Sequence, residues 1–349
     1  MKWKNKLRND FKIEMKKIIR YFYLTRIRIQ TLFWMLFQVI KPRSEPLFIC
    51  LTIDCESKFR NKIEIEKRYY HINFYQSCLE LNELLEQYGW RATFFINYPE
   101  IKIFQNEKDS PSYLIKILVE GGQDIELHLH PALINPEKNP DLSYYSKQQI
   151  RKMIREGKEL LASLTNKEII AFRAGGYSVG RAEKIINILE EEGFIVDSSV
   201  MPGANNLHQA KFDFSKAPYL NWYHPDYNDF STPGNAKIIE LPITTIIKTN
   251  NNFNSSFFRF DAKNVKIIKN FIKYTYFNNH FRILTFIWHS KEIFDESGHP
   301  TEYYHNIKKT ISLLKNLIDS GKKIEVGSIR DFIGQHLSIT QTRNNHTEL

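Results

Sequence analysis

Residues 47–56 read L-F-I-C-L-T-I-D-C-E, a mainly apolar run that ends in two carboxylates. A short apolar run bounded by charged residues is typical of a strand that is buried on both faces. Side chains two residues apart point to the same side of a strand, so we expect Asp54 and Glu56 to face one way and Cys55 the other. The run therefore predicts a central strand of a parallel sheet with polar chemistry at its carboxyl end.

Similar apolar runs follow along the chain and are separated by segments with helical periodicity. We expect further strands at 91–97, 124–129, 168–172, 194–198, 237–242, 282–289 and 324–326, and helices at 69–88, 110–120, 146–164, 178–192 and 302–320. Strands that alternate with helices predict βαβ units and a parallel sheet. About seven such repeats favour an α/β fold of the distorted (β/α)7-barrel type, with the active site at the carboxyl ends of the strands. No glycine-rich phosphate-binding motif follows a strand, so the sequence gives no support for a nucleotide-binding fold.

Composition and charge divide the chain into three parts. Its 349 residues are 42% hydrophobic and 25% charged, which is typical of a globular protein and excludes a disordered or fibrous chain. Three cysteines are too few for a disulfide framework, so we expect a reducing, cytoplasmic location. Twelve of the 49 basic and two of the 39 acidic residues lie within 1–43, which gives this segment the whole net charge of +10. We predict a basic, aromatic-rich leader at 1–45, a barrel domain at 46–335 and a polar tail at 336–349.

The leader contains an uncharged stretch, 29–40, between basic residues. As a helix this stretch would span about 18 Å, which is too short to cross the roughly 30 Å hydrocarbon core of a membrane. A cleaved signal peptide is not expected either, because the segment lacks a cleavage site made of small residues. Basic residues interleaved with aromatic ones favour peripheral contact with an anionic membrane surface at the inner face of the plasma membrane. Packing on its own domain or on a partner is the alternative. The rest of the chain is electrically neutral, so we expect no nucleic-acid partner.

Polar side chains stand where several predicted strands end. His128 and His130 end one strand as H-L-H-P, Arg173 ends the next in F-R-A-G-G-Y, and His289 ends a late strand in F-I-W-H-S. The carboxyl ends of parallel strands in a barrel converge on one rim. Two neutral imidazoles and a carboxylate make a three-ligand site with an open position, which a catalytic Zn²⁺ ion requires. A further carboxylate and histidine would supply the base and the acid of a metal-assisted hydrolysis.

In this order, these segments resemble the motifs of the polysaccharide deacetylase, or NodB-homology, superfamily (carbohydrate esterase family 4). L-T-I-D-C-E is similar to the T-F-D-D-G motif, and R-A-T-F-F-I follows at the usual interval. Q-D-I-E-L-H-L-H-P is similar to the histidine-containing second motif, A-F-R-A-G-G-Y to the arginine-containing third and I-W-H-S to the last. The resemblance spans about residues 46–330. It implies a distorted (β/α) barrel fold. Members of this superfamily use a divalent metal to remove N- or O-acetyl groups from sugars, and we expect the metal to be Zn²⁺.

The resemblance also implies roles for individual residues. Asp54 matches the general base, Arg173 the residue that orients this base, and His289 the acid that protonates the leaving amine. His128 matches the first metal-binding histidine.

Two ligand positions depart from the family pattern. Cys55 stands at the second aspartate of T-F-D-D-G, and Ala132 stands where the second histidine is usual. We predict that Glu56 and His130 are the replacement ligands, with the thiolate of Cys55 as the alternative to Glu56. These changes resemble a divergent D-x-E / H-x-H-P branch found among surface-polysaccharide biosynthesis proteins.

Four further residues are weaker candidates. Asp197 in V-D-S-S-V is predicted to hold His289 in its acid form, with a helix-capping role as the alternative. Trp222, Tyr223 and His224 lie in a long polar excursion and are predicted to stack on or bind a sugar. A self-packed aromatic loop is the alternative for these three.

The expected function is therefore a metal-dependent hydrolase that removes an acetyl group from an N-acetylated or O-acetylated sugar of a surface polysaccharide or its precursor. One alternative is a catalytically impaired carbohydrate-binding or scaffold protein on the same fold. Another is a hydrolase of a different non-peptide C–N bond.

Overall fold

The computed structural model describes residues 45–58, 69–134, 142–179, 182–206, 212–219, 221–249, 255–263, 265–276 and 282–337. The predicted leader up to residue 44 and the predicted tail beyond residue 337 lie outside these ranges. In the described part of the chain, no helix has both the length and the apolar character needed to cross a membrane.

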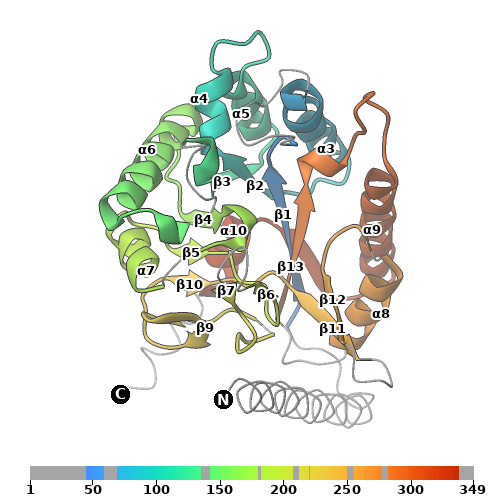
Figure 1. Cartoon of the computed structure of the whole chain (residues 1–349). Coiled ribbons are helices and arrows are strands. Elements are labelled where there is room, and N and C mark those ends of the chain that lie inside the picture. Colours follow the sequence, from blue (N-terminus) through green and yellow to red (C-terminus); the bar gives the residue numbers. More distant parts are fainter. Residues whose placement is uncertain are drawn as a thin grey trace, which may run out of the picture.

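A curled parallel sheet forms the centre of the protein, and helices cover its outside (Figure 1). Its strands follow the order β10-β5-β4-β3-β2-β1-β13, and β14 also pairs with β1. The strands are β1 (Leu47–Cys55), β2 (Thr93–Asn97), β3 (Asp124–Leu129), β4 (Ala171–Ala174), β5 (Val196–Asp197), β10 (Ile239–Glu240), β13 (Ile283–His289) and β14 (Ile324–Gly327). After β10 the chain turns back to the far edge, where Thr244 N donates to the carbonyl of Thr285 on β13 (3.1 Å). This near-closure confirms the expected distorted (β/α)7 barrel.

The predicted helices agree with the observed ones to within a few residues, and the structure adds helices at 98–104 and 265–276 as well as short helices and hairpins. The longer helical elements are η1 (Tyr70–Gln76), α3 (Ser77–Glu86), α4 (Tyr98–Phe104), α5 (Pro111–Glu120), α6 (Lys147–Thr165), α7 (Ala182–Glu191), α8 (Val265–Tyr276) and α9 (Glu302–Asp319). The shorter ones are η2 (Pro131–Leu133), η3 (Leu142–Tyr144), η4 (Gly175–Tyr177), η5 (Ser290–Glu292), α10 (Ile329–Phe332) and η6 (Ile333–Leu337). The antiparallel pairs are β6 (Asn205–Asn206) with β7 (Phe212–Asp213), β8 (Pro225–Asp226) with β9 (Asp229–Pro233), and β11 (Thr245–Thr249) with β12 (Ser255–Arg259).

Hydroxyl side chains set where three of these helices begin. Ser110 and Thr301 each accept a hydrogen bond from a backbone N–H in the first turn of α5 and α9. Ser146 and Gln149 cap α6 reciprocally, each side chain accepting from the other residue's backbone N–H. Such caps satisfy N–H groups that have no partner within the helix and each contribute about 1 kcal/mol.

The alternation of β1 divides the interior into two regions. Its odd-numbered residues, from Leu47 to Cys55, lie in the core between the sheet and the outer helices. Phe48 and Cys50 point into the barrel, where they join a small apolar cluster that α10 completes through Phe332, whose ring lies 5.5 Å from that of Phe48. The barrel interior is thus apolar near the strand starts, and polar residues take over toward the strand ends.

Parallel register brings these polar residues to one rim. Asp54 on β1 is level with His289 on β13, Asn97 on β2 with His128 on β3, and His128 with Arg173 on β4. Side chains that are far apart in the sequence therefore become neighbours at the carboxyl end of the sheet.

Candidate active site

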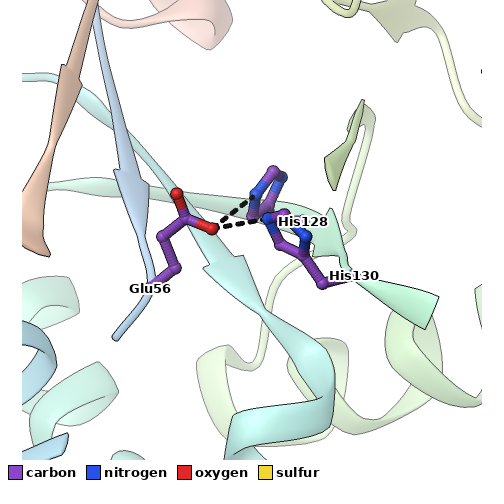
Figure 2. A group of neighbouring side chains, drawn as sticks. All are labelled: Glu56, His128 and His130. Atoms are coloured by element: carbon purple, nitrogen blue, oxygen red, sulfur yellow. Dashed lines mark ion pairs between the residues drawn. The ribbon is translucent and has the colours of Figure 1, made fainter. Parts of the chain in front are cut away.

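Glu56, His128 and His130 converge at this rim (Figure 2). Glu56 follows β1, His128 lies near the end of β3 and His130 comes just after it. Glu56 Oε2 lies 2.5 Å from His130 Nε2 and 3.8 Å from His128 Nε2, and the three ligand atoms all lie within 4.8 Å of one another. Cys55 lies on the opposite face of β1, in the outer core, as the alternation predicts. The structure thus brings together the carboxylate and the two imidazoles that the sequence predicts as ligands.

The hydrogen bonds around this cluster fit a metal ion. His128 Nδ1 lies 2.9 Å from the carbonyl of Arg173, which can only accept, so Nδ1 carries the hydrogen and Nε2 presents a lone pair. Glu56 Oε2 and His128 Nε2 are buried, and neither has a hydrogen-bond partner among the described residues. Buried polar atoms are rarely left in this state. One carboxylate oxygen and two imidazole nitrogens form a ligand set that suits Zn²⁺.

A buried network that the sequence did not reveal holds two of these ligands in place. Asn97, at the end of β2, accepts a hydrogen bond from His130 N (3.1 Å) and donates to Glu100 Oε1 (2.8 Å). Glu100 also accepts from the backbone N–H of Ser57, the residue after Glu56 (3.0 Å). Burial raises the pKa of Glu100 to about 7, although these donors oppose the rise. The sequence feature that could have pointed to this network is the position of Asn97, a polar residue at the end of a predicted strand.

The two glycines of A-F-R-A-G-G-Y have different roles, one in packing and one in backbone conformation. A Cβ atom at Gly175 would lie 2.5 Å from the ring atom Cγ of His130, so only glycine leaves room for this imidazole. Gly176 and Tyr177 both have φ of +60°, a conformation that is unfavourable for tyrosine. The Tyr177 hydroxyl accepts a hydrogen bond from Arg259 Nη1 (2.8 Å). Neither Tyr177 nor Arg259 was singled out from the sequence.

Asp54 and Arg173 form a buried ion pair beside the cluster. Arg173 is fully buried and donates from Nη1 to Asp54 Oδ1 (2.7 Å) and to Thr52 Oγ1 (2.9 Å). Its Nε donates to the carbonyl of Ser198, and its guanidinium lies 4.2 Å from the ring centroid of Phe95. Burial alone would raise the pKa of Asp54, but the positive charge of Arg173, helped by nearby histidines, holds it below its ordinary value. Asp54 is therefore an ionised carboxylate with a fixed orientation.

His289 lies on the other side of this carboxylate. Its Nε2 is 3.8 Å from Asp54 Oδ2, and its backbone N–H donates to the hydroxyl of Tyr303 (3.3 Å). Burial lowers the pKa of His289 to about 3, although the charge of Asp54 opposes the decrease. The rim thus holds an ionised carboxylate next to a neutral imidazole at neutral pH.

Comparison with known proteins relates part of the chain to a known family. The sequence profile of the family described as polysaccharide deacetylase matches residues 74–194, a stretch that contains His128, His130 and Arg173. This match and the shared fold relate the chain to the polysaccharide deacetylase superfamily. The match supports a hydrolase of the deacetylase kind. Comparison with curated protein sequences gave no match.

Solved structures share the fold of this protein. A protein from Mycobacterium smegmatis described as a polysaccharide deacetylase superposes with a TM-score of 0.57 at 14% identity, over 86% of this chain and 93% of that chain. A protein from Pseudomonas aeruginosa PAO1 with the same description gives 0.53 at 16% identity, over 83% of this chain and 92% of that chain. The allantoinase Puue gives 0.54 at 15% identity, over 83% and 91%. At these identities the likeness concerns the fold.

Asp197, the predicted partner of His289, has other neighbours in the structure. Its Oδ1 accepts a hydrogen bond from Ser199 Oγ (2.7 Å), and its carboxyl group interacts with that of Glu240. Both carboxyl groups are fully buried, and burial raises the pKa of Asp197 to about 6 and that of Glu240 well above its ordinary value. The carboxylate near His289 is Asp54, and no described contact joins Asp197 to His289.

The three aromatic candidates for sugar binding contact the protein itself. The Tyr223 hydroxyl donates to the carbonyl of Phe230 (2.5 Å). Trp222 packs on the apolar cluster inside the barrel and lies edge-on to the His224 ring at 5.8 Å. Nδ1 of His224 lies 3.1 Å from the carbonyl of Ile238. Within the described part of the chain, none of these contacts reaches Glu56, His128 or His130.

Proposed function

We propose that this protein is a divalent-metal-dependent hydrolase that removes an acetyl group from an N-acetylated, or O-acetylated, sugar of a surface polysaccharide or its precursor. The observation that carries the proposal is the buried Glu56–His128–His130 cluster beside the Asp54–Arg173 pair. Three ligand atoms converge there, with the imidazole nitrogens of His128 and His130 beside Glu56 Oε2, and an ionised base stands next to them.

The residues present fit the metal ion that the superfamily implies. Glu56 Oε2, His128 Nε2 and His130 Nε2 would hold it, and the carbonyl of Arg173 keeps His128 in the required tautomer. When bound, Zn²⁺ polarises the acetyl carbonyl and lowers the pKa of water.

The other side chains at the rim have separable roles in the reaction. Arg173 occupies Oδ1 of Asp54, so Oδ2 is the atom that takes a proton from the attacking water. When the bond between the acetyl carbon and the sugar nitrogen breaks, the nitrogen must gain a proton. The proton that Oδ2 of Asp54 has taken from water can reach this nitrogen through Nε2 of His289, which lies 3.8 Å from Oδ2. Its low pKa makes it a poor base but a strong acid once it is protonated.

The proposed location is cytoplasmic, with residues 1–43 in contact with the anionic inner face of the plasma membrane. The basis is the concentration of the whole net charge in that segment. Residues 46–335 would then form the catalytic barrel, with a carbohydrate as its substrate.

The test combines metal content with acetate release. Elemental mass spectrometry of the full chain should find one divalent ion, lost in both His128→Ala and His130→Ala. Acetate release from N-acetylated sugar oligomers should fall about a thousandfold in Asp54→Asn, because the general base is removed while the metal ligands are kept. His305→Ala is a matched control, because His305 lies in α9 and is not one of the three residues of the cluster.

The same experiment separates the alternatives. One bound ion with no acetate release, but with opening of a cyclic ureide ring, would indicate a hydrolase of another C–N bond. Absence of any ion after zinc loading, together with retained sugar binding, would indicate a carbohydrate-binding protein.

A further inference from the structure

Lys291 is a charged residue of the rim that has no part in the function proposed above. It lies in η5, two residues after His289, and its Nζ is 2.5 Å from Glu56 Oε1. The neighbouring Ser290 accepts a hydrogen bond from Glu56 N (3.1 Å) and donates to the carbonyl of Glu56 (3.2 Å). The turn after β13 is therefore joined to Glu56 through both backbone and side chain.

The two oxygens of Glu56 consequently have different neighbours. Oε1 faces the ammonium group of Lys291, and Oε2 faces the imidazoles of His128 and His130. The Glu56 side chain is 3% exposed and that of Lys291 is 27% exposed. Lys291 thus reaches from a partly exposed position to a carboxylate that solvent cannot hydrate.

We propose that Lys291 is a positioning residue that serves as the permanent countercharge of Glu56. It keeps the ligand cluster assembled in the absence of metal, restricts Glu56 to one ligand oxygen, and weakens the binding of the divalent ion. This inference rests on the metal site of the proposed function.

Charge balance is the physical reason. With neutral imidazoles, Glu56 and Lys291 together have no net charge, whereas Glu56 alone would leave an uncompensated buried carboxylate, which is strongly destabilising. A divalent ion held by the cluster would lie within a few ångströms of the ammonium group, and like charges repel strongly in a poorly hydrated site. One residue thus stabilises the metal-free protein and opposes metal binding.

These two effects have opposite signs, which makes the inference testable on the full chain. In Lys291→Met, the dissociation constant for Zn²⁺, measured by competition with a chelating dye, should decrease at least about tenfold. The melting temperature of the chelator-treated variant should fall by about 5 °C, because Glu56 loses its countercharge. Lys291→Arg should restore both quantities to near their original values.

Lys263→Met is the matched control. Lys263 forms an ion pair with Glu292 (2.8 Å) and is 52% exposed, so its loss should change neither quantity appreciably. Equal or weaker Zn²⁺ binding by Lys291→Met, or an unchanged melting temperature, would overturn the inference.

Failure of the proposed function can be told apart from failure of this inference. If no form of the protein binds a divalent ion, both fail. If the two opposite shifts occur but no sugar is deacetylated, the role of Lys291 stands and the deacetylase proposal falls.

Discussion

The two ends of the barrel interior use similar residues in different ways, and β3 contributes to both. Near its start, Glu126 Oε2 accepts from the backbone N–H groups of Ile170 and Ala171 (2.7 Å each), and Oε1 accepts from Arg330 Nη2 (2.8 Å). Asp124 accepts from Arg330 Nε (2.9 Å) as well. Two residues further along the same face, His128 has a buried Nε2 with no hydrogen-bond partner in the described structure.

This difference shows how a structural polar group can be distinguished from a functional one. Buried carboxylates at the strand starts have donors for both oxygens, so they stabilise the fold and leave no capacity for a ligand. At the strand ends, Glu56 Oε2 and His128 Nε2 face each other without a donor between them. Such an arrangement is costly unless a cation completes it. The same strands therefore provide stability at one end and chemistry at the other.

The largest effect on stability is expected at the strand starts. Arg330→Met should reduce the free energy of unfolding by about 3 kcal/mol, because the buried carboxyl groups of Glu126 and Asp124 would lose the hydrogen bonds that Arg330 donates to them. Zn²⁺ binding at the other end should not change. Denaturant unfolding and metal titration measure the two quantities.

Lys116→Met is the control for this change, since Lys116 and Glu120 form an exposed pair worth well under about 1 kcal/mol. If Arg330→Met weakened Zn²⁺ binding while leaving stability intact, the division between the two ends would be wrong.

At the strand ends, a substitution is expected to affect metal binding more than stability. Gly175→Ala should weaken Zn²⁺ binding roughly 10- to 100-fold, because the new methyl group displaces the His130 ring from the cluster. The stability of the metal-free protein should change much less than in Arg330→Met. Gly334→Ala is the control, since a Cβ there meets no atom within 4 Å. Unchanged affinity in Gly175→Ala would argue against His130 as a ligand.

The smallest effect is expected at the Asp197–Glu240 pair, in which two buried carboxyl groups interact with each other. Burial raises the pKa of Asp197 from 3.8 to about 6, so the folded protein keeps protons to a higher pH than the unfolded chain. The stability that this provides is complete at low pH and is lost as the pH rises through about 6.

Glu240→Gln replaces the shared proton by a permanent amide donor. The free energy of unfolding of the variant minus that of the original chain should therefore increase by about 1 kcal/mol as the pH rises from about 5 to about 7. Unfolding curves at several pH values measure this difference. A difference that does not vary with pH would show that the pair shares no proton.

Local patterns in the sequence were sufficient to predict much of the fold and the convergence of Glu56, His128 and His130. The apolar run of 124–129 predicted β3 with its observed bounds, and period-two alternation predicted that Glu56 faces the site while Cys55 does not. The neighbours of Asp197, Trp222 and Tyr223 were not predictable in this way. Their contacts join segments whose distance in space depends on how the sheet curls.

The sequence by itself determined the strands, the polar residues at their ends and hence the chemistry that the rim can perform, because side-chain alternation and parallel register are local rules. Tertiary structure decided which polar atoms are satisfied. Asn97 reaches His130, Gly175 makes room for its ring, and Lys291 faces Glu56 only because β1, β2, β3, β4 and β13 meet at one rim. Hydrogen bonding and charge balance depend on distances in space, and no spacing along the chain encodes them.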